Sequence, residues 1–287
     1  MQPFDYAAPP TLEEALQILS QASGLVRPIA GGTDLIAQIK ERRIAPSLVL
    51  NVKEIAEANV LDYDPGQGLR IGAAVSCSDV ASYAPVAAHY PSLAQACLLV
   101  GSTQIQNRGS VGGNVCNAAP SADTVPPLLT YDAVAVIAGP GGSRRVPLED
   151  FFQGPGKTAL QPQELLIEVL LPPPLPNSNS RYLRFIPREE MDIAVAGVGS
   201  MVAVDPQTNT CTRARIALAS VAPTPIRAKE AERRLEGSPL TEEAIREAGE
   251  LAASACSPIS DIRGSAAYRK ELVKVLTRRT LSQSLPR

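Results

Sequence analysis

The chain has 287 residues, 27 basic and 29 acidic side chains, and a hydrophobic fraction of 45%. That length and composition indicate a folded protein of two or three structural units and exclude disorder as the main state. The formal charge of −2 provides no basic field for a polyphosphate backbone, so we expect no nucleic-acid binding.

Secretion, membrane insertion and metal binding are also disfavoured. Residues 1–6 lack the basic and apolar stretches of a signal peptide, and the apolar stretch 128–139 is interrupted by Asp132. The five cysteines are scattered without the two-residue spacing of zinc or iron–sulfur ligands, which indicates reduced and mostly buried thiols. We therefore expect a cytoplasmic protein with no membrane span and no metal site.

The single histidine, His89, limits the available chemistry. A catalytic triad, a histidine relay or a histidine-rich metal site would each need that one residue. An enzyme with this composition is expected to take its reactivity from a bound cofactor.

The first 55 residues predict a small β-α-β-α-β unit. A capping-box pattern at Thr11 starts an amphipathic helix, which a strand over residues 25–30 follows. After a tight turn, Thr33 is the expected N-cap of a second helix that runs to about residue 42. A strand over residues 47–52 closes the unit.

The segment from residue 69 to residue 171 mixes helices and strands. We expect no regular structure in its polar, glycine-rich stretch 101–117. The proline-rich run 172–180 cannot form a helix or a central strand, so we expect a domain boundary there. The remaining expected elements are strands over residues 69–75, 133–139 and 165–171, and helices over residues 76–83 and 92–100.

Beyond this boundary, two long strands precede three helices. Because strands and helices mix without a long β-α alternation, the predicted fold class is α+β. The last helix carries a run of basic side chains, which indicates a solvated face or, as the alternative, a face that docks a partner. The expected strands cover residues 193–204 and 211–221, the helices cover residues 228–235, 242–255 and 268–281, and the basic run is Arg269, Lys270, Lys274, Arg278 and Arg279.

Two glycine-rich segments carry the candidate chemistry. The first, residues 30–35, lies between a predicted strand and a predicted helix, where glycines let the main chain approach a ligand and the helix start offers unpaired N–H groups to an anion. Alone it is a weak signal, since such a turn is more often only a turn. The second, residues 104–123, combines glycines with hydroxyl, amide and carboxylate side chains and could wrap a polar ligand. Together they could hold a pyrophosphate between two sets of N–H donors.

Two common nucleotide-binding motifs are absent from the sequence. No Gly-x-Gly-x-x-Gly opens a helix after a strand, so a Rossmann fingerprint is excluded. Residues 156–158, Gly-Lys-Thr, look like the end of a Walker A loop, but the first glycine of that motif is replaced by Phe151. A nucleotide triphosphatase is therefore disfavoured.

The two glycine-rich segments resemble the FAD-binding motifs of the medium, flavoprotein subunit of the xanthine dehydrogenase and aerobic carbon monoxide dehydrogenase family, the molybdenum hydroxylases. The most specific part is the second segment followed by Asp-Thr-Val-Pro-Pro-Leu-Leu at residues 123–129. The resemblance extends over nearly the whole chain. It also includes residues 6–19, Asp-Phe-Phe-Gln-Gly at 150–154, Glu-Leu-Leu-Ile-Glu at 164–168, and residues 184–194.

The resemblance implies a two-part, PCMH-like FAD-binding region, with subdomains at residues 1–57 and 58–176, and a smaller α+β domain at residues 181–287. Residues of the first segment would wrap the pyrophosphate of FAD and part of the second would meet it, while other positions would lie nearer the flavin or line the site. The implied FAD-binding residues are Pro28, Ile29, Ala30, Gly31, Gly32, Thr33, Asp34, Leu35, Gly101, Ser110, Gly113, Asn114, Asn117, Asp123, Leu165, Leu166 and Arg184.

The resemblance also implies an electron-transfer role inside a larger complex. A large subunit would carry the molybdenum cofactor, and a small subunit with two [2Fe-2S] clusters would deliver electrons to FAD on this chain. The complex would be a dimer of heterotrimers, and NAD, quinone or oxygen would be the external acceptor. Because no cysteine occurs between Cys116 and Cys211, the additional iron–sulfur cluster of some relatives should be absent.

Other interpretations remain open at this stage. The chain could be a self-contained flavin oxidase or reductase, or a scaffold that assembles a complex without a cofactor. Cys116 could be redox-active or only a small buried thiol. Asp34 could bond a ribose hydroxyl or cap its own helix.

Overall fold

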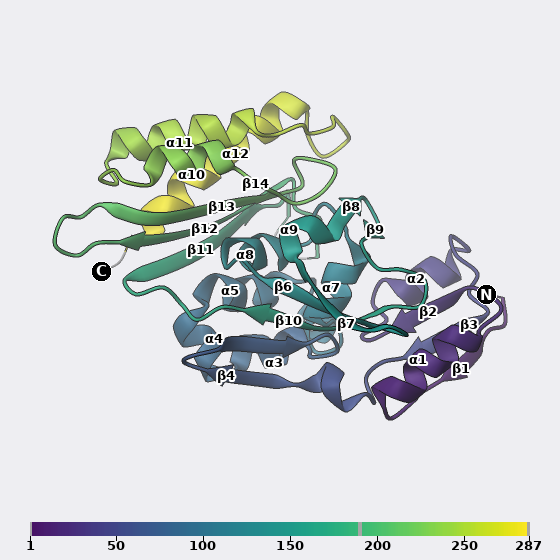
Figure 1. The fold of residues 1–287 in the computed structure, drawn as a ribbon. Coiled ribbons are helices and arrows are strands. Elements are labelled where there is room, and N and C mark those ends of the chain that lie inside the picture. The colour runs from purple at the N-terminus through teal and green to yellow at the C-terminus, as the bar shows by residue number, and fades with distance from the viewer. Residues whose placement is uncertain (1, 189–190, 286–287) are drawn as a thin grey trace.

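The N-terminal unit is a three-stranded parallel sheet in the order β1-β3-β2, with two helices in the connections (Figure 1, purple). We describe the chain from a computed structural model that covers residues 2–188 and 191–285. The predicted β-α-β-α-β order is confirmed, and the Thr11 hydroxyl caps the first helix by accepting a hydrogen bond from the Glu14 N–H at 3.2 Å. The elements are β1 (Asp5–Ala7), α1 (Leu12–Gln21), β2 (Val26–Ile29), α2 (Leu35–Lys40) and β3 (Leu48–Asn51).

A five-stranded antiparallel sheet, in the order β4-β5-β10-β6-β7, forms the middle of the molecule. Helices pack on it around a large cluster of buried residues that includes Ile71, Leu93, Val115 and Ile137. The elements are η1 (Ala56–Asn59), β4 (Leu61–Asp64), β5 (Gly68–Gly72), α3 (Cys77–Ser82), α4 (Ala84–His89), α5 (Pro91–Leu99), α6 (Thr103–Gln106), α7 (Val111–Asn117), α8 (Val125–Thr130), β6 (Val134–Gly139), β7 (Gly142–Pro147), α9 (Leu148–Phe151), β8 (Phe152–Gly154), β9 (Lys157–Thr158) and β10 (Leu165–Leu171).

A four-stranded antiparallel sheet, in the order β11-β12-β13-β14, forms the C-terminal part. Three helices cover one face of this sheet, and α5 and α8 pack against the other face (Figure 1). Helices on both faces explain why every residue of β12 is buried. The elements are β11 (Ser178–Phe185), β12 (Ala196–Val204), β13 (Cys211–Ala219), β14 (Ile226–Arg227), α10 (Lys229–Leu235), α11 (Glu242–Ser254) and α12 (Ala266–Gln283).

One of the two expectations about irregular chain is wrong. The stretch 101–117 contains helices α6 and α7, because Ser110 caps α7 and the apolar side chains of that helix enter the large core. Packing there outweighs the low helix propensity of two adjacent glycines. The run 172–180 forms neither a helix nor a central strand, as predicted, and its residues 178–180 begin β11, which lies at the edge of its sheet. An edge position is compatible with a start directly after a proline-rich segment.

The expected N-cap of α2 is also wrong. The helix begins at Leu35, and the N-cap position belongs to Asp34, whose side chain makes no capping hydrogen bond. Thr33 lies one residue further out, in the turn. The first turn of α2 therefore keeps unpaired main-chain N–H groups.

Arg269 contradicts the expectation that the basic run on the last helix is solvated. Its side chain is only 5% exposed and donates to the carbonyl oxygens of Val195 (2.7 Å) and Ser220 (3.1 Å) and to Asp261 (2.7 Å). Arg269 thus joins α12 to both long strands of the C-terminal sheet. Arg278 and Arg279 are exposed, as expected.

Within residues 2–188 and 191–285, no helix has the length and apolar character needed to cross a lipid bilayer.

Replacing Arg269 by alanine should destabilise the C-terminal part. The substitution leaves two buried carbonyl oxygens and Asp261 without their donor, so we expect the free energy of unfolding to fall by about 3 kcal/mol. Denaturant unfolding measures this change. The control is Arg279→Ala on the exposed face of the same helix, which should change stability by less than about 0.5 kcal/mol. Equal effects of the two substitutions would contradict the structural role of Arg269.

Candidate functional site

The first glycine-rich segment forms a turn at the carboxyl edge of the parallel sheet, between β2 and α2. Ligands of open α/β units bind at this edge, where strand ends and helix starts meet. Within the described parts of the chain, no acceptor pairs with the main-chain N–H groups of residues 31–35. The turn therefore presents a series of free donors, as the sequence predicted.

The second glycine-rich segment turns between α6 and α7 and is fixed to the end of β5. The Cys77 N–H donates to the Gly109 carbonyl at 2.9 Å, and the Val111 N–H donates to the Val75 carbonyl at 3.3 Å. The Ser110 hydroxyl accepts from the Gly113 N–H at 3.0 Å and so caps α7. Among the residues described here, the N–H of Ser110 itself has no hydrogen-bond acceptor.

The two turns contact each other through their main chains. A Cβ atom added to Gly31 would lie 2.1 Å from the Arg108 carbonyl oxygen and 2.7 Å from the Gly109 Cα. The sequence analysis explained these glycines by the close approach of a ligand. At Gly31, however, the absence of a side chain allows the close approach of the second turn. Similarly, Gly112 lies against the Ala73 main chain, where an added Cβ would be 2.5 Å from the carbonyl oxygen. The glycines thus bring both sets of N–H donors to one place.

Three further predicted residues lie on or beside the second turn. Asn114 follows it in α7, and its side-chain oxygen accepts a hydrogen bond from the Thr124 hydroxyl at 2.7 Å. Asn117 is half-buried at the C-terminal end of the same helix. Gly101 has a φ of +53° ahead of α6, a conformation that glycine adopts without strain.

Asp123 and Arg184 form a buried ion pair between the central region and the C-terminal sheet. The Arg184 Nη1 lies 2.5 Å from the Asp123 Oδ2, and the Tyr182 hydroxyl donates to the Asp123 Oδ1 at 2.8 Å. Burial raises the pKa of Asp123, while the charge of Arg184 and the hydrogen bond from Tyr182 oppose that rise. Burial and the adjacent Asp123 hold the pKa of Tyr182 well above its ordinary value, so its hydroxyl remains a donor. The Arg184 Nε is also buried, and it has no hydrogen-bond partner among the residues that the structure describes.

Leu165 and Leu166 point into two different hydrophobic clusters from opposite faces of β10. Leu165 is 3% exposed and packs with Ala15 and Leu50 of the N-terminal unit, whereas Leu166 is 6% exposed and belongs to the large central core. Alternation along a strand explains this division. Both leucines therefore stabilise the surroundings of the turns.

The structure bears on the two residues whose roles the sequence left open. Burial raises the pKa of the Cys116 thiol to about 12, so the thiol is protonated near neutral pH and is a poor nucleophile. Asp34 is exposed and makes no capping hydrogen bond to α2.

The sequence analysis missed Thr124 and Tyr182. Thr124 directly follows Asp123, and Tyr182 lies two residues before Arg184, so strand alternation puts both β11 side chains on one face. That spacing could have indicated Tyr182 once β11 was recognised.

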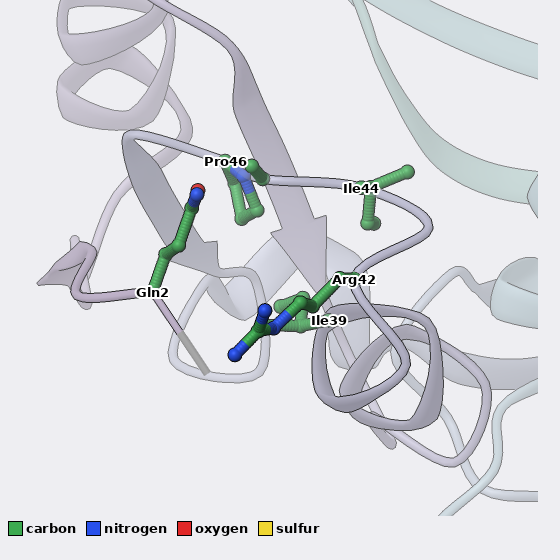
Figure 2. A pocket seen from close by; sticks show the side chains of 6 residues that line it. Gln2, Ile39, Arg42, Ile44 and Pro46 are labelled. Atoms are coloured by element: carbon green, nitrogen blue, oxygen red, sulfur yellow. The ribbon is translucent and has the colours of Figure 1, made fainter.

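Two hollows in the described structure lie away from the turns. One hollow of about 50 Å³ is lined by Gln2, Ile39, Arg42, Ile44 and Pro46, which Figure 2 shows around the chain that leaves α2 and enters β3. It lies at the amino edge of the parallel sheet, opposite the turn between β2 and α2. The other, a groove of about 660 Å³, lies between the proline-rich linker and the β12–β13 hairpin.

Comparison with known proteins identifies the family. A model described as the FAD binding domain in molybdopterin dehydrogenase matches residues 2–174, and one described as the CO dehydrogenase flavoprotein C-terminal domain matches residues 181–284. The chain belongs to the FAD-binding medium subunits of the molybdenum hydroxylases. The recognition from sequence and the α+β, two-part fold are therefore confirmed.

Relatives match over almost their full length. The carbon monoxide dehydrogenase medium chain of Hydrogenophaga pseudoflava is 32% identical, with 99% of this chain and 98% of the relative covered. The xanthine dehydrogenase FAD-binding subunit of Escherichia coli O157:H7 is 30% identical, with 98% and 97% covered. A solved structure of the Hydrogenophaga pseudoflava carbon monoxide dehydrogenase that lacks the Mo-pyranopterin moiety matches with a TM-score of 0.94, 31% identity, and 99% and 98% covered.

Replacing Gly31 by alanine should weaken FAD binding without a similar effect at a remote glycine. The added Cβ cannot coexist with the Arg108 carbonyl, so the turns must separate and part of the N–H donor set is lost. We expect the Kd for FAD, measured by quenching of flavin fluorescence, to rise about 10-fold or more. Gly141→Ala is the control, because an added Cβ there meets nothing within 4 Å. Unchanged FAD affinity in Gly31→Ala would contradict the importance of the contact.

Proposed function

We propose that this chain is the electron-relay flavoprotein of a molybdenum hydroxylase complex. It accepts electrons from [2Fe-2S] clusters of a small partner subunit through FAD and passes them to an external acceptor. The observation that carries the proposal is the meeting of two glycine-rich turns whose main-chain N–H groups lack partners within the described chain. Free N–H donors at one point suit the diphosphate bridge of FAD.

The predicted site residues fall into groups that suit different parts of FAD. Residues 28–35 would hold the diphosphate through their main chain, and Ser110, Gly113 and Asn114 would meet it from the second turn. Gly101, Asn117 and Asp123 would lie nearer the flavin and ribityl parts. Arg184 would act through Asp123, to which its Nη1 donates in the buried cluster. Leu165 and Leu166 would act indirectly, because their packing stabilises the elements around the site.

FAD suits a relay because its isoalloxazine ring can exchange either one electron or two electrons at a time. The chain's own residues need to bind and orient the cofactor. Main-chain amides do so without a strongly basic surface, in agreement with the formal charge of −2. The Asp123, Tyr182 and Arg184 cluster holds its charges in fixed positions, because each member is bonded to another and little exposed.

The proposal extends to domains and partners. The FAD-binding region comprises subdomains at residues 1–57 and 58–176, and residues 181–287 form the α+β domain. The partners are a large subunit with the molybdenum cofactor and the small [2Fe-2S] subunit, in a dimer of heterotrimers. Relatives named as medium chains or FAD subunits of dehydrogenases support a multi-subunit assembly. NAD, quinone or oxygen is the external acceptor.

Saturating FAD should stabilise the purified chain. At a free FAD concentration of about 100 times the Kd, mass action adds about 2.7 kcal/mol, which raises the melting temperature of a chain this size by about 5 °C or more. Thermal unfolding with and without FAD measures the shift, and the isolated protein should be yellow. A cofactor-free scaffold would show neither property.

The isolated FAD-loaded chain should have no steady-state turnover with organic substrates of molybdenum hydroxylases. Dithionite should still reduce its flavin, since reduction requires only an electron donor. The reconstituted complex should turn over. Substrate-dependent turnover by the isolated chain would instead favour a self-contained flavin oxidase or reductase.

A further inference from the structure

Lys53 lies at the same sheet edge as the first glycine-rich turn. It follows β3 by two residues, and β3 pairs in parallel with β2 so that Asn51 is opposite Ile29. The Val52 N–H donates to the Ile29 carbonyl at 3.0 Å, which continues the pairing to the start of the turn. Lys53 and Gly31 therefore leave neighbouring strands at the same level.

The side chain of Lys53 extends toward the support of the second turn. Its Nζ donates to the Ala74 carbonyl at 3.3 Å. The next residue, Val75, accepts the hydrogen bond that fixes the second turn at Val111. Lys53 is half-buried, and one hydrogen bond leaves two of the three N–H donors of its ammonium group for another acceptor.

Lys53 is close to a second cation, Arg108, whose carbonyl touches Gly31. Burial and the charge of Arg108 lower the pKa of Lys53, and the more weakly acting carboxylates of Asp79 and Glu54 oppose this. Over residues 2–188 and 191–285, neither cation has a carboxylate within ion-pair distance. The positive charges of Lys53 and Arg108 repel each other, and a bound anion would offset that repulsion.

We propose that Lys53, assisted by Arg108, binds the diphosphate bridge of FAD where the two glycine-rich turns meet. The inference rests on the proposed function, since it assigns a charged residue to the same cofactor site. The main-chain donors would supply direction, and Lys53 would supply positive charge from the sheet edge beside the first turn. Arg108, which is exposed, would contribute less because solvent screens its charge.

The test compares Lys53→Met, Lys53→Arg and Lys40→Met in the full chain. Lys40 is exposed at the far end of α2 and provides a matched loss of charge in the same subdomain. Fluorescence titration with FAD should give a Kd about 10-fold to 100-fold higher for Lys53→Met, a smaller change for Lys53→Arg, and no change for Lys40→Met. Thermal unfolding without FAD checks that each variant is folded.

Two further measurements separate a charge effect from a structural one. Riboflavin has no phosphate, so its affinity should be equal in wild type and Lys53→Met. Raising the salt concentration should weaken FAD binding more in wild type than in Lys53→Met, because the variant has lost a screened attraction. Unchanged FAD affinity in a folded Lys53→Met variant, or equal salt dependence, would overturn the inference. Failure of wild type to bind FAD would instead overturn the proposed function.

Discussion

The proposed cofactor site depends on a main-chain contact between Gly31 and the Arg108 carbonyl. The first turn belongs to the parallel unit and the second to the central region, so their contact requires that the parallel unit pack firmly on the central antiparallel sheet. A hydrophobic cluster meets that requirement by combining Leu19 and Leu50 of the parallel unit with Leu165 and Ile167 of β10. The site therefore depends on a core several residues away from any cofactor contact.

Ion pairs help to join the C-terminal sheet to the central region. Asp123 pairs with Arg184, and Asp132 accepts from Arg215 Nε at 3.1 Å and from Arg227 Nη1 at 2.7 Å. The Asp123–Arg184 pair is buried, whereas Asp132 is exposed. A buried pair adds little net stability, but breaking it leaves an uncompensated charge. The buried pair therefore selects one arrangement of the two parts.

The chemistry of the chain agrees with a relay more than with a self-contained catalyst. Its one histidine, His89, stacks on Tyr63 with ring centroids 4.8 Å apart, on an element remote in sequence from both turns. Burial keeps the Cys116 thiol protonated. An electron relay needs a bound cofactor in a defined orientation, and unpaired amides, a buried ion pair and a half-buried lysine provide the means for that.

The α+β class, most helices and strands, and the two segments that form the turns could be predicted from the sequence. Caps, apolar periodicity and glycine-rich runs are local signals. The structure was needed to show that α7 is a helix, that Arg269 is buried, that Asp123 meets Arg184, and that Lys53 bonds to the Ala74 carbonyl. Each of these depends on contacts between residues far apart in the chain, and neither propensity nor periodicity carries information about such partners. The two glycine-rich segments, which are far apart in the sequence, therefore meet only in the folded chain.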